Sequence, residues 1–209
     1  MPNDPIGSHQ PPEPAEHAPS YRPPRTAQEL LERYRNGARS FPGTELPETD
    51  LRGADLRDAD FRTSYFAGAK FDGANLTGVD FHGSFLTKTS FDSALLTRAN
   101  LRETRLDRAD LNDAQMSSTD LRDATLRLTS FRGANLSDSD LRGATVGIAD
   151  FTDASLSHAD LRGVDLKSTL LIRSDLTGAD LENTRLPDAP ANREGMRGYP
   201  SDREHAIER

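Results

Sequence analysis

The 209-residue sequence is long enough for one ordinary domain, and its net charge of −8 disfavours a general nucleic-acid-binding protein, which would carry a basic patch. The absence of cysteine excludes disulfides, thiolate metal sites and a thiol nucleophile. Apolar residues make up only 34% of the chain, and no apolar run reaches the roughly 18 residues of a membrane span.

Residues 1–25 contain eight prolines and few apolar residues, which predicts a disordered or extended arm. The arm has no apolar stretch typical of a signal peptide. We therefore expect a soluble, cytoplasmic protein.

Residues 26–45 are predicted to form a capping helix and the entry to the main domain. Thr26 and Glu29 have the spacing of a capping box, and Gly37 follows the last helical turn. Leu30, Leu31 and Tyr34 lie along one stripe of this helix. With Phe41, the stripe could cover one end of the following domain.

From residue 46 to residue 188 a large apolar residue occurs at every fifth position. The 28 positions from Leu51 to Leu186 hold nineteen Leu, seven Phe, Met116 and Val146. The position two residues before each of these core centres is always Ala, Ser, Thr or Val. Neither a helix nor a strand has a period of five, so the pattern predicts a chain that turns a corner in every unit, with the large and small residues pointing inward.

The outward residues indicate how many units complete one coil. Columns of like residues appear when the sequence is folded at twenty residues, and folding at fifteen scatters the arginines. One column holds arginine (Arg62, Arg102, Arg122, Arg142, Arg162) and its neighbour holds aspartate (Asp60, Asp80, Asp120, Asp140, Asp160, Asp180). Four units per coil gives about seven coils, or roughly 34 Å at about 4.8 Å per coil.

The segments "ADLRDADF" (54–61), "ANLTGVDF" (74–81) and "ADLRGVDL" (159–166) resemble the A(D/N)LXX consensus of pentapeptide repeat proteins. The resemblance covers about two thirds of the chain. It implies an all-β solenoid, a right-handed quadrilateral β-helix.

Residues 189–209 form a polar tail with two open interpretations. The tail could cover the second end of the solenoid through Met196, Tyr199 and a short helix at "SDREHAIER", or it could be disordered.

We predict no catalytic, cofactor-binding or metal-binding residues. The five histidines lack metal-ligand spacing, and no nucleophile elbow, phosphate-binding or dinucleotide-binding motif occurs. An interior filled by Leu and Phe also leaves no ligand cavity. The sequence therefore favours a protein that is not an enzyme.

Two sets of outward residues are candidates for partner binding. Carboxylates outnumber cations on the side centred on 51, 71 and onward to 171 (Asp72, Asp92, Asp110, Asp113, Asp150, Asp153), and the neighbouring side is basic (Lys88, Arg105, Arg108, Arg127, Lys167). Apolar residues occupy outward positions in adjacent coils (Tyr65, Phe85, Leu128, Ile148, Leu170, Ile172). Contiguous exposed apolar residues often mark interfaces, and tail packing is the other open explanation. The interface hypothesis is a homodimer joined near the C-terminal coils.

Two functional hypotheses follow. The resemblance extends to rod-like, acidic quinolone-resistance and gyrase-inhibitor self-resistance proteins, which implies a DNA mimic that binds DNA gyrase and protects it from inhibitors. Residues 46–188 hold 24 acidic and 17 basic residues, a difference of −7, or about −1 per coil, against about three per 4.8 Å of duplex DNA. Mimicry would therefore be partial and confined to the acidic side. The alternative is a scaffold or regulatory module that binds an unrelated protein.

Overall fold

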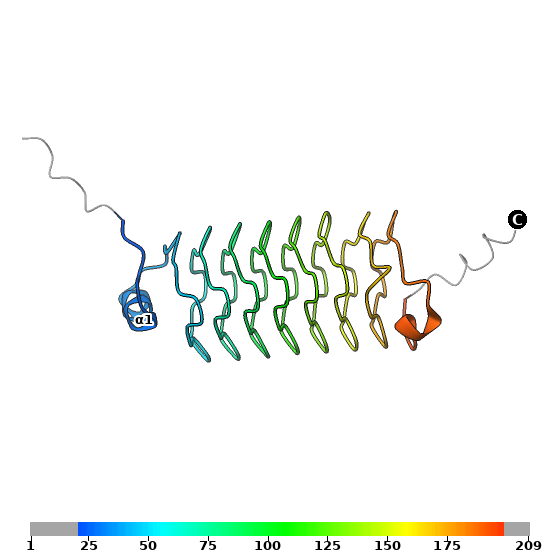
Figure 1. The fold of residues 1–209 in the computed structure, drawn as a ribbon, viewed down its shortest axis with the longest axis horizontal. Coiled ribbons are helices and arrows are strands. Elements are labelled where there is room, and N and C mark those ends of the chain that lie inside the picture. Colours follow the sequence, from blue (N-terminus) through cyan, green and yellow to red (C-terminus); the bar gives the residue numbers. More distant parts are fainter. Residues whose placement is uncertain (1–20, 199–209) are drawn as a thin grey trace, which may run out of the picture.

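The computed structural model describes residues 21–198, which form a rod of stacked coils with a helix at the N-terminal end (Figure 1). The helices are α1 (Ala27–Arg35) and the 3-10 helix η1 (Pro190–Arg193). Within residues 21–198 the β-structure consists of isolated single-residue bridges, and no longer strand forms. Of the predicted arm at residues 1–25, residues 1–20 lie outside the described residues. Residues 21–25 are ordered against the domain, because Pro24 is buried and Tyr21 Oη donates to Pro42 O at 3.0 Å.

The bridges confirm the prediction of four units per coil. They are all parallel, and from Ser40 with Asp60 to Asp165 with Arg185 they join residues twenty apart; the last bridge, Asp175 with Arg197, spans 22 residues. The amide of the core centre donates to the next coil, as from Leu56 to Asn75 O at 2.8 Å. Each coil therefore lies directly on its neighbour, and the rod is four-sided.

Each five-residue unit closes with a tight turn that explains the consensus. In the first full unit Ala54 N donates to Leu51 O at 3.1 Å, and the intervening Gly53 has a φ of 64°. The aspartate before the core centre stabilises the same turn, since Asp50 Oδ1 accepts from Arg52 N at 3.1 Å. This Asx hydrogen bond is a local preference of Asp and Asn.

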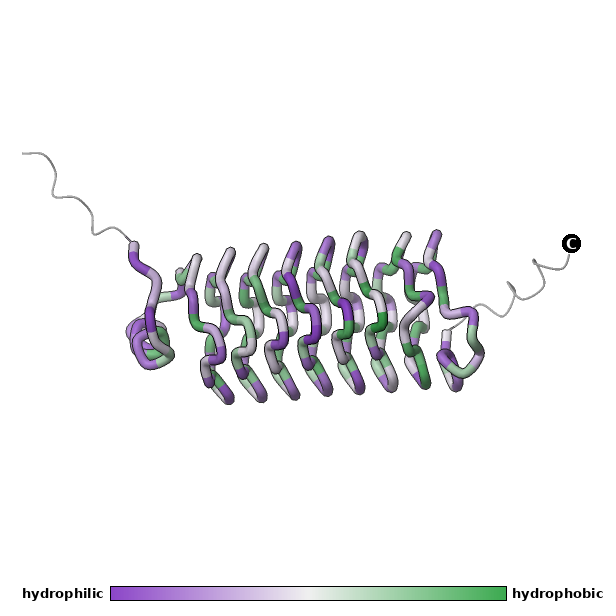
Figure 2. Tube along the Cα trace, in the orientation of Figure 1, coloured by the Kyte–Doolittle hydropathy of each residue, from purple (hydrophilic) through white to green (hydrophobic). Residues whose placement is uncertain are grey.

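The predicted core centres and small residues fill the interior. Phenylalanines stack directly between coils, with ring centroids 5.4 Å apart for Phe61 and Phe81 and 4.8 Å apart for Phe131 and Phe151. Inward hydroxyls satisfy backbone carbonyls, as where Ser84 Oγ donates to Phe61 O at 2.7 Å. Figure 2 shows the resulting recurrence of apolar positions from coil to coil.

The stack starts earlier than the sequence pattern alone indicated. Phe41 is a core centre, 1% exposed and stacked on Phe61 with a centroid distance of 5.6 Å. Helix α1 contributes buried Leu30 and Tyr34 to the same core, and Tyr34 Oη donates to Arg57 O at 3.0 Å. Thr26 Oγ1 accepts from Glu29 N at 3.1 Å, whereas the Glu29 carboxylate accepts from Arg25 N rather than from Thr26.

At the second end, the start of the predicted tail pairs with the last coils. Leu171 N donates to Asn192 O at 2.6 Å and Leu176 N donates to Arg197 O at 3.0 Å. Met196 packs against the core with part of its surface buried. The predictions for Tyr199 and for a helix at 201–209 concern residues outside the described part of the chain.

One side of the rod lacks coil-to-coil hydrogen bonds between two neighbouring coils. The bridge expected between Thr145 and Asp165 is absent from the described residues, although the equivalent bridge one coil earlier, between Thr125 and Thr145, is present. The amides of Val146 and Ile148 have no backbone acceptor in residues 21–198, whereas those of Leu126 and Leu128 donate at 2.8 and 3.1 Å. We call this interruption, between residues 143–148 and 162–167, the coil gap.

Candidate functional site

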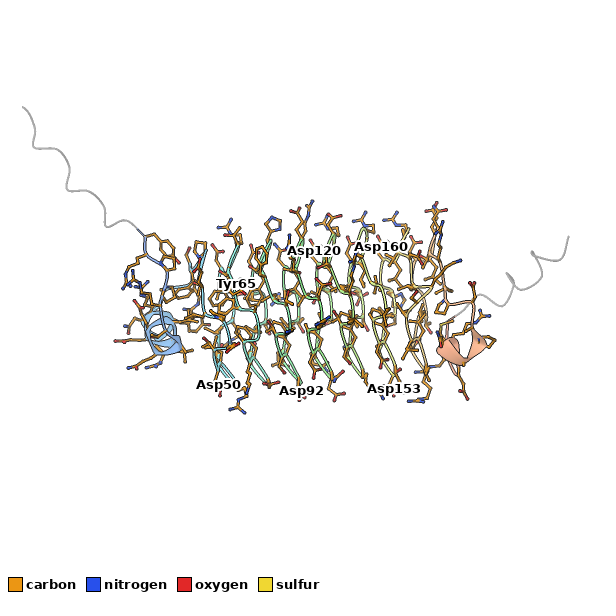
Figure 3. All side chains as sticks on the ribbon, in the orientation of Figure 1. Asp50, Tyr65, Asp92, Asp120, Asp153 and Asp160 are labelled. Atoms are coloured by element: carbon orange, nitrogen blue, oxygen red, sulfur yellow. The ribbon has the colours of Figure 1, made fainter. Side chains whose placement is uncertain are left out.

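Two edges of the rod carry charged residues in different arrangements. Figure 3 shows Asp120 and Asp160 along one edge, and Asp50, Asp92 and Asp153 along the opposite edge. The first edge holds the predicted arginine and aspartate columns. The second holds the predicted acidic residues.

The arginine and aspartate columns form a continuous run of ion pairs in the C-terminal half of the rod. Arg142 binds Asp140 with its Nη2 at 2.6 Å and reaches Asp160 on the next coil with its Nε at 3.2 Å. Arg162 repeats this with Asp160 and Asp180 at 2.6 and 3.4 Å. We call this run the arginine–aspartate ladder. Each cation lies between two anions, so the ladder neutralises itself and leaves little charge for a partner.

The ladder is interrupted where the sequence replaces aspartate with asparagine. Asn100 donates to Asp80 Oδ1 at 2.9 Å, and Arg102 has no carboxylate two residues before it. Arg102 approaches Glu103 at 3.3 Å and Asp123 at 3.6 Å instead. The nearer contact involves Nε, a buried atom without a well-aligned hydrogen bond, so we regard both contacts as weak.

Of the six predicted acidic residues, the structure brings together four that form no ion pair, although Arg52 interacts electrostatically with one of them, Asp72, at longer range. These four, which we call the acidic cluster, occupy successive coils (Asp72, Asp92, Asp110, Asp113). No cation within residues 21–198 forms an ion pair with any of them. Ser90 Oγ donates to Asp72, and Asp110 Oδ1 accepts from Asn112 N at 3.0 Å.

The pKa of Asp92 reports the repulsion inside the acidic cluster. Partial burial raises this pKa, and the charges of Asp110, Asp113 and Asp72 raise it further. Asp50, on the same side of the rod, shows the opposite case, because hydrogen bonds from Arg52 lower its pKa to about 2. The acidic cluster is therefore a place where negative charge accumulates at an energetic cost.

The other two predicted acidic residues are neutralised by arginines. Asp150 binds Arg132 at 2.9 Å, and Asp153 binds both nitrogens of the Arg173 fork at 2.7 and 2.5 Å. Hydrogen bonds from Arg173 lower the pKa of Asp153. The sequence pattern did not count Arg173 as a countercharge, and the acidic surface is therefore shorter than predicted.

The outward apolar residues fall into three groups. Tyr65 and Phe85 form a bridge between adjacent coils, with ring centroids 6.1 Å apart. Leu128 and Ile148 are exposed at 48% and 65%; Ile148 borders the coil gap and Leu128 lies one coil earlier. Leu170 and Ile172 are only half-buried, so they contribute less apolar surface than the sequence predicted.

Leu95 is an exposed apolar residue of the repeat that was not among the predicted ones; it is 40% exposed and lies on a different side of the rod. Its neighbours in the same column are Asn75 and Gln115, so it does not extend any patch. The signal was available in the sequence, where Leu95 and Leu96 break the polar–apolar pattern of the unit.

Within residues 21–198 no group of three or more histidine, aspartate or glutamate side chains is arranged to hold a metal ion. None of the helices in this range has the length and hydropathy to cross a bilayer.

Comparison with known proteins identifies the repeat. A family model of pentapeptide repeats, in eight copies, matches residues 44–83, 74–113, 109–146 and 149–186. No curated protein matches the chain.

Several solved structures are similar. HetL, a pentapeptide repeat protein involved in heterocyst differentiation regulation from the cyanobacterium Nostoc sp. strain PCC 7120, is 25% identical, with a TM-score of 0.36 over 82% of this chain and 94% of HetL. Full-length QnrB1, a plasmid-mediated fluoroquinolone resistance protein, is 20% identical, with a TM-score of 0.46 over 76% of this chain and 82% of QnrB1. A protein of the Arabidopsis thaliana thylakoid lumen is 31% identical, with a TM-score of 0.39 over 50% of this chain and 69% of that protein.

Proposed function

Because the chain belongs to the pentapeptide repeat family, we propose that it is a non-enzymatic rod that binds another protein through its side surfaces. The acidic cluster is the observation that carries this proposal. Four carboxylates on successive coils have no cation partner within the described residues, while the arginine–aspartate ladder on another side is neutralised. A rigid stack holds these charges at fixed spacing, which suits recognition of a basic surface.

The specific partner we propose is DNA gyrase or a related type II topoisomerase, which the rod would protect from inhibitors as a partial DNA mimic in the cytoplasm. Four carboxylates over three coils of about 4.8 Å give one charge per roughly 3.6 Å. One strand of DNA carries one charge per about 3.4 Å. The acidic cluster therefore resembles a short stretch of one strand, rather than the whole duplex.

A supercoiling assay with purified gyrase tests this proposal. We expect the protein to inhibit supercoiling or to relieve drug-stabilised cleavage, and we expect Asp92→Asn with Asp113→Asn to weaken the effect about tenfold. The matched control is Asp150→Asn with Asp153→Asn. It also removes two negative charges, but from carboxylates that are paired with arginines, and it should have a smaller effect. Absence of any effect on gyrase by the unaltered protein at micromolar concentration would refute gyrase binding.

A second candidate is a scaffold or regulatory module with an unrelated protein partner, including a homodimer joined near the C-terminal coils. The exposed pair Leu128 and Ile148 favours it, because exposed apolar residues in adjacent coils often belong to an interface. Ile148 also has a φ of 60°, an unfavourable conformation for a β-branched residue.

Light scattering after size-exclusion chromatography tests the homodimer. We expect a dimer for the unaltered protein and a monomer for Ile148→Glu, with Leu95→Glu as the control on another side of the rod. A monomer before substitution would rule out the homodimer.

A further inference from the structure

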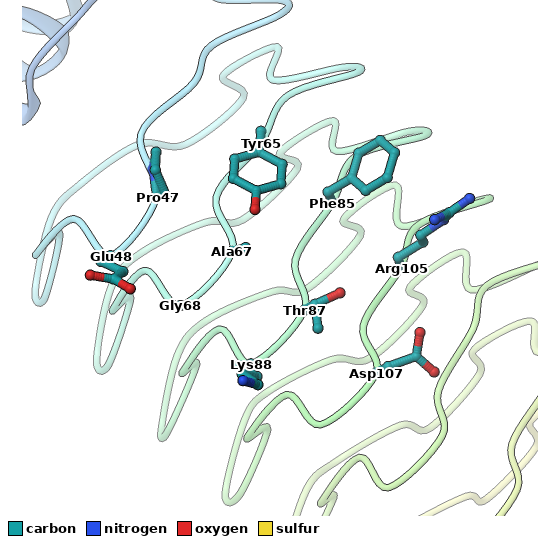
Figure 4. A pocket seen from close by; sticks show the side chains of 10 residues that line it. All are labelled: Pro47, Glu48, Tyr65, Ala67, Gly68, Phe85, Thr87, Lys88, Arg105 and Asp107. Carbon is teal, nitrogen blue, oxygen red and sulfur yellow. The ribbon is translucent and has the colours of Figure 1, made fainter.

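An open groove of about 500 Å³ lies in the N-terminal half of the rod. It is on the side that carries Tyr65 and Phe85, which neighbours the edge with the arginine–aspartate ladder. Figure 4 shows Tyr65, Phe85 and Arg105 in a row along one margin of the groove. Glu48, Gly68 and Lys88 lie along the other margin, and the row between the two margins consists of Pro47, Ala67, Thr87 and Asp107. The two rings are 44% and 39% exposed, so the groove combines an apolar wall with a polar rim.

The groove has a cationic end. Arg105 holds its guanidinium over the Phe85 ring, with Cζ 4.8 Å from the centroid, a cation–π contact that fixes the group while its N–H donors remain available. Lys88, Arg105 and Arg108 form no ion pair with any carboxylate of residues 21–198. The same holds for Arg127 on the next coil.

The charge balance of this end is positive. On this side of the three coils from Phe85 to Leu128 there are four cations (Lys88, Arg105, Arg108, Arg127) and one carboxylate (Asp107), a net charge of +3. Lys88, Arg105 and Asp107 line the groove, and Arg108 and Arg127 lie outside its lining. The Asp107 carboxylate accepts hydrogen bonds from two uncharged groups, the Thr125 hydroxyl at 2.8 Å and the backbone amide of Arg127 at 3.2 Å. In a protein with a net charge of −8, a cluster of unpaired cations beside exposed rings is a local exception.

We propose that this groove docks an acidic segment of a partner protein. An apolar or aromatic side chain of the segment would pack on Tyr65 and Phe85, and its carboxylates would bind Arg105 and Lys88. Arginine supplies fork-shaped donors that match a carboxylate, and an aromatic anchor beside such donors is typical of interaction hot spots. The inference rests on the proposed role as a protein-binding rod, but it uses a surface separate from the acidic cluster.

The surroundings favour an acidic protein over single-stranded nucleic acid, which also binds grooves of rings and cations. Glu48 lies at one end of its margin and Asp107 lies near the opposite end of the groove (Figure 4), and the rod as a whole is acidic. A continuous phosphate backbone would meet these carboxylates, whereas a peptide can place its charges only at the cationic end.

Fluorescence anisotropy with the full-length protein tests the inference. The probe is a short labelled peptide in which glutamates flank a phenylalanine. Comparison peptides replace glutamate with glutamine or phenylalanine with serine, and a single-stranded DNA oligonucleotide is the fourth probe. We expect saturable binding of the first peptide only.

The chain offers matched variants for each part of the contact. Phe85 and Leu95 occupy equivalent positions of their units and are 39% and 40% exposed, so Phe85→Ser should weaken binding about tenfold while Leu95→Ser leaves it unchanged. Lys88 and Arg98 share the turn position, with φ values of 61° and 60°, and neither has a carboxylate partner in residues 21–198. Lys88→Glu should weaken binding about tenfold and Arg98→Glu less than about twofold.

Three outcomes would overturn the inference: no saturable binding of the glutamate–phenylalanine peptide, equal loss in the matched variants, or tighter binding of the oligonucleotide with loss in Lys88→Glu. If one of these outcomes is found while Phe85→Ser and Lys88→Glu still inhibit gyrase, the assignment of the groove is wrong. The assignment of the acidic cluster is then unaffected. The circular dichroism spectrum of every variant must match that of the unaltered protein, which shows that the variant is folded.

Discussion

At the scale of single residues, pairing rather than composition decides which carboxylates remain available. Asp150 and Asp110 occupy equivalent positions before a core centre, yet Asp150 binds Arg132 at 2.9 Å and Asp110 forms no ion pair among the described residues. The positions of the arginines on adjacent coils make the difference. Negative charge therefore accumulates in the acidic cluster.

Asp92→Asn should increase stability near neutral pH by a few tenths of a kcal/mol, because it removes one charge from an exposed cluster of like charges. Since the folded-state pKa of Asp92 is raised, its ionisation destabilises the fold as pH rises through that pKa. The advantage of the variant should therefore disappear as pH falls below about 4, where both states bind the proton.

Urea denaturation of both proteins between pH 3 and pH 8 measures this effect. Asp153→Asn is the control and should destabilise at neutral pH, because the pKa of Asp153 is lowered by Arg173. An Asp92→Asn protein less stable than the original at pH 7 would contradict the prediction.

At the scale of elements, the five-residue unit is encoded locally but its stacking is not uniform. The Asx hydrogen bond and the positive φ at the third residue of the turn recur along the rod. The coil gap interrupts this regularity at Val146, the one valine among the 28 core centres from Leu51 to Leu186, next to Gly147. Local turns can therefore persist where the hydrogen bonds between coils do not.

Among the coils between the two ends of the rod, hydrogen exchange should be fastest at the coil gap. The amides of Val146 and Ile148 lack acceptors among the described residues, so we expect them to exchange at least about tenfold faster than those of Leu126 and Leu128 one coil earlier. Amide exchange followed by NMR measures both pairs in one sample. Equal protection of the two pairs would mean that the coils are closed in solution.

At the scale of the whole molecule, the rod depends on protecting its two ends. Solenoid ends expose unpaired backbone groups and core side chains unless they are covered. Helix α1 lies at the first end with Leu30 fully buried, and residues 192–197 pair with the coil of 171–176 at the other. Both covers come from segments outside the regular repeat.

Leu30→Ala should lower the free energy of unfolding by about 2–4 kcal/mol, because it empties a buried position where the helix meets the core. It should also increase concentration-dependent association through the uncovered end. Leu31→Ala, at the half-buried neighbouring leucine, is the control. Thermal unfolding and light scattering of both variants measure the two effects, and equal values for Leu30→Ala and Leu31→Ala would contradict this role of the helix.

The sequence by itself determined the repeat, the identity of the core residues and the twenty-residue coil, because all three depend on local turn preferences and on the alternation of large and small side chains. The quadrilateral solenoid follows from them and from the family. Tertiary structure alone decided which charges pair, as with Arg173 and Asp153, and where stacking fails. Those outcomes depend on distances and side-chain directions between residues about twenty apart, which a five-residue pattern does not specify.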